Sequence, residues 1–190
     1  MRITGGAARG IPLVLPKGDA VRPATDAMRQ AVFSSLAGRV PGAWFLDLFA
    51  GSGAYGLEAL SRGAAGGSFV ERNPKAAACL RENIAAVCKS LRRGTHDLQV
   101  LQLDATSATA TTAVTVPDLV FIDPPYDVIP AVAPGLFAHL TALLASQADP
   151  VIVFEMPGEI ELTPEGWTCV KRLGKGARQP TVAFFRRAGG

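Results

Sequence analysis

The sequence predicts an α/β protein built on a mostly parallel β-sheet with helices on both faces. From Trp44 onward, short apolar runs of strand type alternate with longer segments of helical periodicity. Because parallel strands must be joined by crossovers, usually helices, this alternation is typical of a parallel sheet covered on both sides. The tail is different, since residues 167–173 and 181–185 predict a terminal antiparallel hairpin.

The expected elements follow one another in a regular order. Residues 1–24 mix Gly, Pro and Arg with short apolar pieces, which indicates a hairpin-like extension before a main domain of residues 25–190. Asp26 suits the dipole of the first helix, and Asn73 with Pro74 forms the N-cap and first turn of another. The remaining expectations are helix 26–37, strand 44–49, helix 55–61, strand 68–70, strand 98–103, strand 119–122, helix 130–145 and strand 151–154.

Composition and charge narrow the class of protein. Of the 190 residues, 48% are hydrophobic and 18% are charged, as in one layered globular domain and unlike a disordered chain. The net charge is only +3, but basic residues gather in the first 24 residues and in the last twenty. Basic ends around a near-neutral middle indicate a polyanionic partner, although ordinary solubilising charge explains them equally well.

Neither a membrane nor a metal is expected as a partner. No continuous apolar run approaches the roughly 18 to 20 residues of a membrane span, and the start lacks the apolar core of a secretory signal, so we expect a cytoplasmic protein. Cys79, Cys88 and Cys169 show no disulfide or metal spacing, and His96 and His139 lie apart from them. We also expect a monomer.

A glycine-rich turn follows the first predicted strand. Gly51, Gly53 and Gly56 match G-x-G-x-x-G between a strand and a helix, which is the context that a nucleotide-binding turn requires. Glu71, about twenty positions after the turn, ends the second strand and fits a ribose-binding carboxylate. This pattern by itself allows either a dinucleotide or S-adenosylmethionine as the ligand.

Asp47, just before the turn, favours S-adenosylmethionine. A carboxylate there would repel a pyrophosphate, whereas S-adenosylmethionine has no phosphate and carries an ammonium and a sulfonium. The glycines would let the backbone approach that ligand, because a Cβ would block it. The alternative is a tight strand-helix turn with a capping aspartate. Asp104 follows the third strand. The sequence supports two interpretations of it equally: it accepts a hydrogen bond from an adenine amine, or it caps a helix.

The tetrapeptide Asp123-Pro124-Pro125-Tyr126 follows the fourth strand and is the strongest signal. The prolines remove backbone donors and stiffen the segment, which leaves carbonyls free to point into a cleft. The Asp123 carboxylate and the Pro124 carbonyl can then accept hydrogen bonds from one amino group and aim its lone pair at a methyl carbon. Tyr126 offers a flat face for an extruded base. These residue types predict methylation of an amino nitrogen, and a plain proline-rich turn is the alternative.

With these motifs the chain resembles the bacterial small-subunit ribosomal RNA guanine-N2 methyltransferases over nearly its whole length. The resemblance is carried by residues 1–10, 22–26, 46–53, 56–64 and 123–126. It implies the class I S-adenosylmethionine-dependent methyltransferase fold, which is Rossmann-like with a seven-stranded sheet, and a partner that is 16S ribosomal RNA or the assembling small subunit. Two positions depart from the family: Ala27 replaces a usual arginine, and Asn73 replaces a frequent aspartate.

The resemblance also implies a set of site residues. Substrate contacts come from Asp123, Pro124, Pro125 and Tyr126, and RNA contacts from Arg2, Arg9 and Arg22. The candidate S-adenosylmethionine site comprises Thr25, Asp26, Asp47, Phe49, Ala50, Gly51, Ser52, Gly53, Glu71, Arg72, Asn73, Asp104 and Ala105.

Three other functions stay open on the sequence. A DNA adenine or cytosine amino-methyltransferase would use the same tetrapeptide, although the chain has no spare length for a domain that reads DNA sequence. A catalytically idle RNA-binding or assembly protein would keep the fold alone. A nicotinamide-dependent oxidoreductase would use the glycine turn but not the tetrapeptide.

Overall fold

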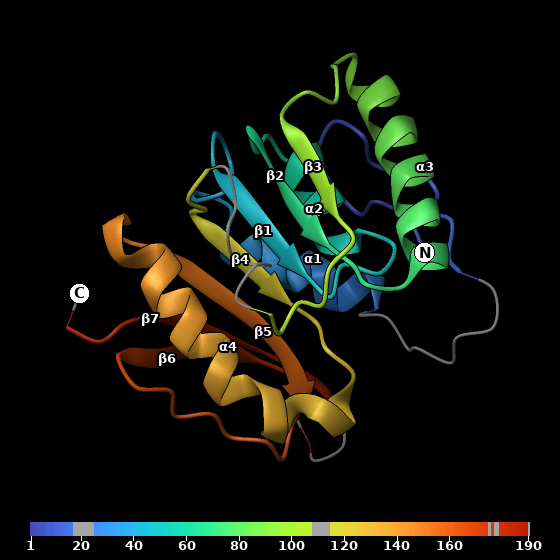
Figure 1. Ribbon diagram of the computed structural model, residues 1–190. Helices are drawn as coiled ribbons and strands as arrows, with labels where there is room; N and C mark the ends of the chain where they lie inside the picture. Colours follow the sequence, from blue (N-terminus) through green and yellow to red (C-terminus); the bar gives the residue numbers. More distant parts are fainter. Residues whose placement is uncertain (17–24, 108–114, 175, 177–178, 190) are drawn as a thin grey trace.

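The computed structural model describes residues 1–16, 25–107, 115–174, 176 and 179–189, and a seven-stranded sheet lies at its centre (Figure 1). Neighbouring strands from β3 to β5 pair in parallel, and β7 is antiparallel to both β5 and β6. The predicted parallel sheet and terminal hairpin are thereby confirmed. In spatial order the strands are β3 (Leu98–Leu101), β2 (Gly66–Val70), β1 (Trp44–Leu48), β4 (Leu119–Ile122), β5 (Val151–Pro157), β7 (Pro180–Arg187) and β6 (Trp167–Leu173).

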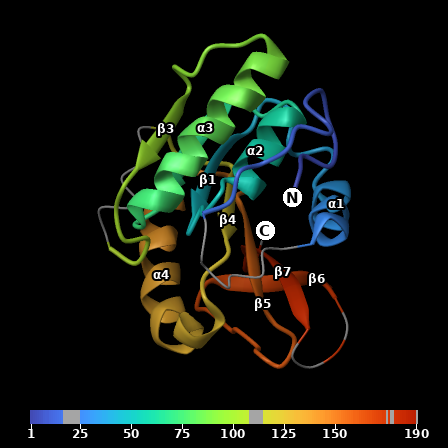
Figure 2. The same cartoon turned by 90° about the vertical axis from the view of Figure 1, so that its right-hand side faces the viewer.

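Helices cover the two faces of this sheet. α1 (Asp26–Ser35), α2 (Ala54–Ser61) and α3 (Pro74–Leu91) pack with Phe45 and Phe121 in one buried cluster. α4 (Ile129–Leu143) packs with Leu46 and Ile122 in a second cluster, and short 3-10 turns, η2 (Tyr126–Val128) and η3 (Leu144–Ser146), flank it. Figure 2 shows α1 and α4 on opposite sides of the strands. Neighbouring strand residues enter different clusters because side chains alternate across a strand.

The helix starts follow the capping chemistry that the sequence indicates. The Asn73 side chain accepts hydrogen bonds from the backbone N–H groups of Lys75 (2.9 Å) and Ala76 (3.3 Å), which confirms it as the N-cap of α3. Thr25 does the same for α1, since its hydroxyl accepts from the Met28 N–H at 3.2 Å. Both caps satisfy N–H groups that the first helical turn leaves without a partner.

Several strand boundaries differ from the prediction: β1 ends at Leu48 instead of residue 49, β5 runs to Pro157 instead of residue 154, and β7 covers Pro180–Arg187 instead of 181–185. In β3 and β2 the local cause is visible. β3 ends at Leu101 instead of residue 103, because the Asp104 side chain bonds to Thr106 and turns the chain. β2 begins two residues early, at Gly66. A Cβ on Gly67 would lie 2.3 Å from the Phe45 carbonyl oxygen, so glycine is required where β1 and β2 approach closely. Glycine is depleted in strands, and the sequence pattern therefore missed this part.

The first sixteen residues pack onto α2. Ile3 and Leu13 donate backbone N–H bonds to the carbonyls of Ile11 (2.9 Å) and Met1 (3.1 Å), which forms the expected hairpin-like pairing. Ile3 is fully buried in the same cluster as α1 to α3. The buried Glu58 carboxylate accepts from the Thr4 N–H at 2.8 Å and from its hydroxyl at 2.7 Å. Burial and hydrogen bonds fix this segment on the domain.

The three arginines of the C-terminal basic cluster that the structure describes all serve the fold. Arg186 pairs with Asp149 at 2.7 Å, and Arg187 donates to the Leu144 carbonyl and lies over the Trp167 ring. Arg172 donates to two backbone carbonyls of the segment after β5. The basic cluster seen in the sequence therefore stabilises the hairpin as well as adding positive charge.

One helical stretch qualifies the expectation about membranes. Residues Tyr126–Ser146 are long and apolar enough to cross a bilayer by length and composition alone, with a mean hydropathy of 1.8. Val, Ile, Leu, Phe and Ala make this stretch apolar, and proline, glycine, histidine and threonine interrupt it, so it contains no long continuous apolar run. Leu136, Phe137 and Leu140 face the sheet, so in this structure it is a core helix. In the described ranges, no group of three His, Cys, Asp or Glu side chains is placed to hold a metal ion.

Candidate active site

The candidate residues of the glycine turn, of the segment after β2 and of the tetrapeptide lie where β1, β2 and β4 end at their carboxyl termini. β1 and β4 are paired in register, with Asp47 opposite Phe121, so the chain after β4 emerges beside the glycine turn that follows β1. In parallel sheets this edge is where ligands bind. Asp123 lies one residue beyond β4, and Glu155 lies within β5.

The glycine turn adopts a backbone that needs glycine at two positions and strains a third. Gly51 and Gly53 have φ of +53° and +79°, and Phe49 has a φ of +60°, which a large side chain seldom adopts. A Cβ on Gly51 would meet only the Phe49 carbonyl oxygen, at 4.0 Å, so open space lies beside Gly51. A Cβ on Gly53 would lie 2.4 Å from Leu80, inside the core.

The motif glycines therefore serve two different purposes, close packing in the core and open space for a ligand, which the sequence pattern did not separate. Gly53 is needed for packing on α3, and Gly56 for packing on β1 and β2, because a Cβ on Gly56 would lie 2.4 Å from the Phe69 ring and 2.6 Å from the Phe45 ring. Of the three motif glycines, only Gly51 adjoins open space. We assign close approach to a ligand to Gly51 alone.

We expect Gly51→Ala and Gly53→Ala to fail in different ways. Gly53→Ala should lower the free energy of unfolding by about 2 to 4 kcal/mol, since it adds overpacking to left-handed strain. Gly51→Ala should cost about 1 to 2 kcal/mol of left-handed strain and should weaken cofactor binding more than folding. Urea denaturation and calorimetric titration with S-adenosylmethionine would measure both. Equal stability losses in the two variants would contradict this division.

The Asp47 carboxylate is buried beneath the turn. Its Oδ2 accepts a hydrogen bond from the Gly56 N–H at 2.8 Å, and the residue is only 2% exposed. This bond ties β1 to the first turn of α2, as in the capping alternative from the sequence. Burial, opposed by the Gly56 hydrogen bond and assisted by the charge of the nearby Glu71, raises the pKa of Asp47 to about 8. Asp47 thus holds the turn in place from below.

The raised pKa of Asp47 predicts a pH dependence of stability. The folded protein holds a proton on Asp47 up to a pH of about 8, whereas an unfolded Asp releases it near its ordinary pKa of 3.8. Between these values the folded state binds more protons, so this group makes stability fall as pH rises. We expect Asp47→Asn to have a smaller decline in unfolding free energy between pH 5 and 8 than the wild type. Urea midpoints across that range would measure it, and parallel curves would contradict it.

Glu71 connects the glycine turn to the start of α3. Its two carboxylate oxygens accept from the N–H groups of Gly51 (2.8 Å) and Asn73 (2.7 Å). Each oxygen retains acceptor capacity, because a carboxylate offers about four lone-pair sites. The structure thus brings together Gly51, Glu71 and Asn73, which the sequence assigned to one site.

Asp104 lies on the loop after β3 and contacts that group through Arg72. Its Oδ1 accepts from the Thr106 N–H (2.9 Å) and hydroxyl (2.7 Å), and its Oδ2 pairs with Arg72 at 3.2 Å. The Thr106 and Arg72 contacts lower the pKa of this mostly exposed carboxyl. Asp104 thus turns the loop, and Ala105 beside it is buried. Contact with an adenine amine stays a prediction.

The tetrapeptide after β4 combines a stiff backbone with a half-buried carboxylate. Pro124 is buried, and Pro125 has an extended backbone and accepts the Val128 N–H at 3.2 Å, which starts the η2 turn. Tyr126 is half-buried beside it. Burial, followed by the charges of Glu155 and Asp47, raises the pKa of Asp123 well above its ordinary value, while Arg29 lowers it.

Three buried side chains that the sequence analysis did not select complete this site. Glu155 in β5 is 1% exposed, and its carboxylate accepts the Tyr55 hydroxyl at 2.8 Å and the Tyr126 hydroxyl at 3.4 Å. Tyr55 in α2 stacks on Phe121, with ring centroids 5.5 Å apart. Glu155 could have been found from the sequence, because it directly follows the predicted strand 151–154, just as Asp123 follows the strand before it.

Arg29 is the third missed residue, and no sequence signal identified it. It lies on the inner face of α1, is fully buried, and donates to Asp26 Oδ1 (2.6 Å) and to the Arg2 carbonyl (2.7 Å). Its charge acts on Asp123, Glu155 and Tyr55 together. An arginine inside an apolar stripe ordinarily extends to solvent, so the pattern of α1 does not predict this position.

The predicted residues near the N-terminus form a separate group. Asp26 pairs with Arg29 and, at 3.5 Å, with the exposed Arg2. Arg2, Arg9 and Asp26 line a hollow of about 270 Å³ at the start of α1. Thr25 caps the same helix, and Ser52 faces Met1, with 3.7 Å between its hydroxyl and the sulfur. Arg22 lies outside the described residues.

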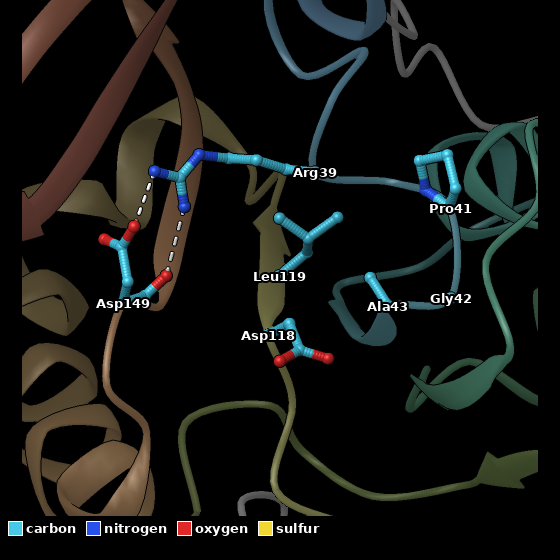
Figure 3. Close-up of a pocket in the computed structure, with 7 residues that line it drawn as sticks. All are labelled: Arg39, Pro41, Gly42, Ala43, Asp118, Leu119 and Asp149. Carbon is cyan, nitrogen blue, oxygen red and sulfur yellow. Dashed lines mark hydrogen bonds and ion pairs between the residues drawn. The ribbon is translucent and has the colours of Figure 1, made fainter.

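A hollow of similar volume lies at the amino ends of the strands, away from these residues (Figure 3). Arg39 and Asp149 form an ion pair of 2.6 Å along its wall. The Asp118 carboxylate accepts from the Trp44 N–H and from Gln147, each at 2.8 Å. Because Arg39 and Asp149 pair with each other and both Asp118 oxygens already accept hydrogen bonds, we assign no ligand to this hollow.

Comparison with known proteins identifies the family of this chain. The family described as Conserved hypothetical protein 95 matches residues 1–185. The chain belongs to this family. A relative of this family member, Ribosomal RNA small subunit methyltransferase D of Escherichia coli strain K12, is 34% identical over 193 residues, which cover 98% of this chain and 90% of the relative.

Comparison with solved structures shows that this chain has the class I methyltransferase fold. The yhhF protein of Escherichia coli has 30% identity and a TM-score of 0.74, over 98% of this chain and 97% of that chain. A hypothetical protein of Thermus thermophilus has 32% identity and a TM-score of 0.72, over 97% and 98% of the two chains. SMU.776, which was solved with S-adenosylhomocysteine, has 13% identity and a TM-score of 0.60 over 83% of this chain and 49% of its own, and concerns the fold alone.

Proposed function

We propose that this protein transfers the methyl group of S-adenosylmethionine to the exocyclic N2 amine of a guanine in 16S ribosomal RNA. The observation that carries the proposal is the tetrapeptide of residues 123–126, placed after β4 and beside the glycine turn after β1. The near full-length similarity to an enzyme named for ribosomal RNA of the small subunit supports the substrate class. The guanine N2 target rests on the sequence resemblance.

The residues at the glycine turn fit S-adenosylmethionine. Open space adjoins Gly51, and the Glu71 carboxylate lies below the turn with spare acceptor capacity for ribose hydroxyls. Asp104 is 44% exposed in its side chain and is free to accept from an adenine amine on its outer side. When bound, S-adenosylmethionine supplies a methyl group activated by the sulfonium. Next to the carboxyl groups of Asp47, Asp123 and Glu155, that positive charge would favour their ionised forms and so oppose the effect of burial on their pKa values.

The residues of the tetrapeptide would bind and orient the amine. Asp123 and the Pro124 carbonyl would accept its two hydrogens, which directs the nitrogen lone pair toward the methyl carbon. In the described part of the chain no hydrogen bond lowers the pKa of Asp123, so its carboxylate remains available to an incoming donor. Tyr126 would stack on the extruded base, and Asp123 would then take the proton that the methylated nitrogen releases.

The arginines near the N-terminus would hold the RNA. Arg2 has a 70% exposed side chain, and Arg9 is also exposed. Both lie on the segment that Ile3 and Thr4 fix to the domain, which would place their charges at a constant distance from the tetrapeptide. Contacts of this kind bind the phosphate backbone and fix the register of the RNA. We propose that the protein acts as a cytoplasmic monomer without a metal.

A transfer assay would test the function. Labelled S-adenosylmethionine is offered with small ribosomal subunits, naked 16S RNA or duplex DNA, and the modified nucleoside is identified. We expect N2-methylguanine in the ribosomal substrates. Label in DNA adenine or cytosine would replace the proposal with the DNA enzyme. Absence of S-adenosylmethionine binding in calorimetry would favour the non-catalytic RNA-binding protein, and binding of a nicotinamide dinucleotide would favour an oxidoreductase.

A further inference from the structure

Glu155 is a buried carboxylate whose contacts all lead to the proposed site. One oxygen accepts the Tyr126 hydroxyl at 3.4 Å, and the other accepts the Tyr55 hydroxyl at 2.8 Å. The fold alone gives no reason for a charged group there, since the neighbours Phe154 and Met156 are fully buried. A buried carboxylate is costly unless it is paired or serves a function.

The position of Glu155 follows from the alternation of β5. Phe154 and Met156 face the cluster around α4, so Glu155 faces the other side, where α1 and α2 lie. Val153, two residues earlier, belongs to that second side. In β4, Phe121 faces the same side. Glu155 is therefore directed toward the space between α2 and the tetrapeptide, which its bonds to Tyr55 and Tyr126 confirm.

Asp123 is surrounded by charged and titratable side chains that belong to four elements of the fold. Glu155 of β5 and Asp47 of β1 act on it as like charges, and Arg29 of α1 acts as the opposite charge. Tyr55 of α2 reaches the same place through its bond to Glu155, and Tyr126 follows on the same segment. Glu71 acts on Asp47 and lies farther out. Within the described residues, Glu155 is the only one of these charged groups that also accepts a hydrogen bond from a side chain of the tetrapeptide, that of Tyr126.

We propose that Glu155 is a positioning residue for methyl transfer: it fixes the Tyr126 ring by accepting its hydroxyl, and it places a carboxylate beside Asp123, because the residues before them, Phe154 and Ile122, are paired in register. This inference rests on the proposed function. The lone pair of the amine forms the new bond to the methyl carbon, the bond from sulfur to that carbon breaks with its electrons on sulfur, and S-adenosylhomocysteine leaves. The nitrogen then carries the positive charge and passes one proton to the Asp123 carboxylate, whose affinity for it Glu155 increases.

Restraint of the Tyr126 ring by Glu155 gives the Tyr126 hydroxyl a role in the site. Stacking of a base requires only the flat face of an aromatic ring. A hydroxyl bonded to Glu155 restrains rotation of that ring before the base arrives, which lowers the entropy lost on binding. Tyr55 holds the other oxygen of Glu155 and is itself stacked on Phe121, so the carboxylate has one fixed orientation.

Glu155→Gln tests the charge while it keeps the shape. A glutamine can accept from one tyrosine and donate to the other, so both hydroxyls retain a partner. Activity on the acid side requires an ionised Asp123 and falls as pH drops through its pKa. Because removal of a like charge lowers that pKa, we expect the acid limb of kcat against pH to move about one pH unit lower in the variant. An unchanged acid limb would overturn the charge role of Glu155.

Tyr126→Phe tests the hydroxyl separately. Loss of one ordinary hydrogen bond should raise KM for the ribosomal substrate roughly fivefold, while kcat and its acid limb change little. An unchanged KM would overturn the ring-fixing role. This variant removes a single atom from a half-buried ring, so it also decides that role if Glu155→Gln fails to fold.

Asp118→Asn is the matched control. Asp118 precedes β4 at its opposite end and, like Glu155, uses both oxygens in hydrogen bonds of the fold, here to Trp44 and Gln147. We expect a change in thermal stability without a change in the acid limb or in KM. If the wild-type protein transfers no methyl group to any substrate, the proposed function fails. A second outcome separates the two proposals. If the wild type is active, but Glu155→Gln has the wild-type pH profile and Tyr126→Phe has the wild-type KM, only the Glu155 inference fails.

Discussion

Replacing Asp123 with alanine should reduce methyl transfer roughly 100- to 10,000-fold, the usual range for a group that accepts a proton and orients a substrate. The variant loses one of the two acceptors that hold the amine, and it also loses the group that takes the released proton. Single-turnover transfer to small ribosomal subunits would measure the loss. Binding of S-adenosylmethionine should change little, because the glycine turn and Glu71 are held by other bonds.

The fold should not suffer from this substitution. Burial raises the pKa of Asp123 well above its ordinary value, which means that the fold disfavours its ionised form, so removal of the carboxyl takes away an unfavourable group. We expect the free energy of unfolding at neutral pH to stay the same or to rise. Turnover equal to that of the wild type would refute the role of Asp123, and loss of cofactor binding together with turnover would move Asp123 into the cofactor site.

The second large effect concerns stability. Arg29→Met should lower the free energy of unfolding by about 3 to 5 kcal/mol, since removal of one partner from a buried charge group leaves the others uncompensated. Arg29 is fully buried, and its positive charge acts on both Asp123 and Glu155. The loss should be smaller at pH 5 than at pH 8, because neutral carboxyls need no counter-charge. Urea denaturation at the two pH values would measure it.

Arg39→Met provides the matched comparison. Arg39 also forms an ion pair with an aspartate at 2.6 Å, but its side chain is 37% exposed, and that of Asp149 is 45% exposed. Exposed pairs contribute at most about 1 kcal/mol, because water screens them. We expect Arg39→Met to cost less than that. Equal losses in the two variants would show that burial of Arg29 does not matter.

Much of the fold was predictable because its signals are local. Strand runs such as residues 119–122 and the N-cap of α3 at Asn73 depend on alternation, periodicity and side chains that bond to their own backbone. The errors occurred where a local signal conflicts with tertiary packing. Gly66 and Gly67 form part of β2 because strands approach closely there, although glycine disfavours strands.

The sequence by itself determined the sheet, the glycine turn and the tetrapeptide, including the carboxyl strand ends at which Asp47, Glu71 and Asp123 were expected to lie. Only the tertiary structure decided which atoms these groups face. Asp47 and Glu71 bond to the turn, while Arg29, Tyr55 and Glu155, which are far apart in the chain, meet around Asp123. The physical reason is that strand periodicity fixes the face of the sheet, whereas burial and charge pairing depend on which helices cover that face.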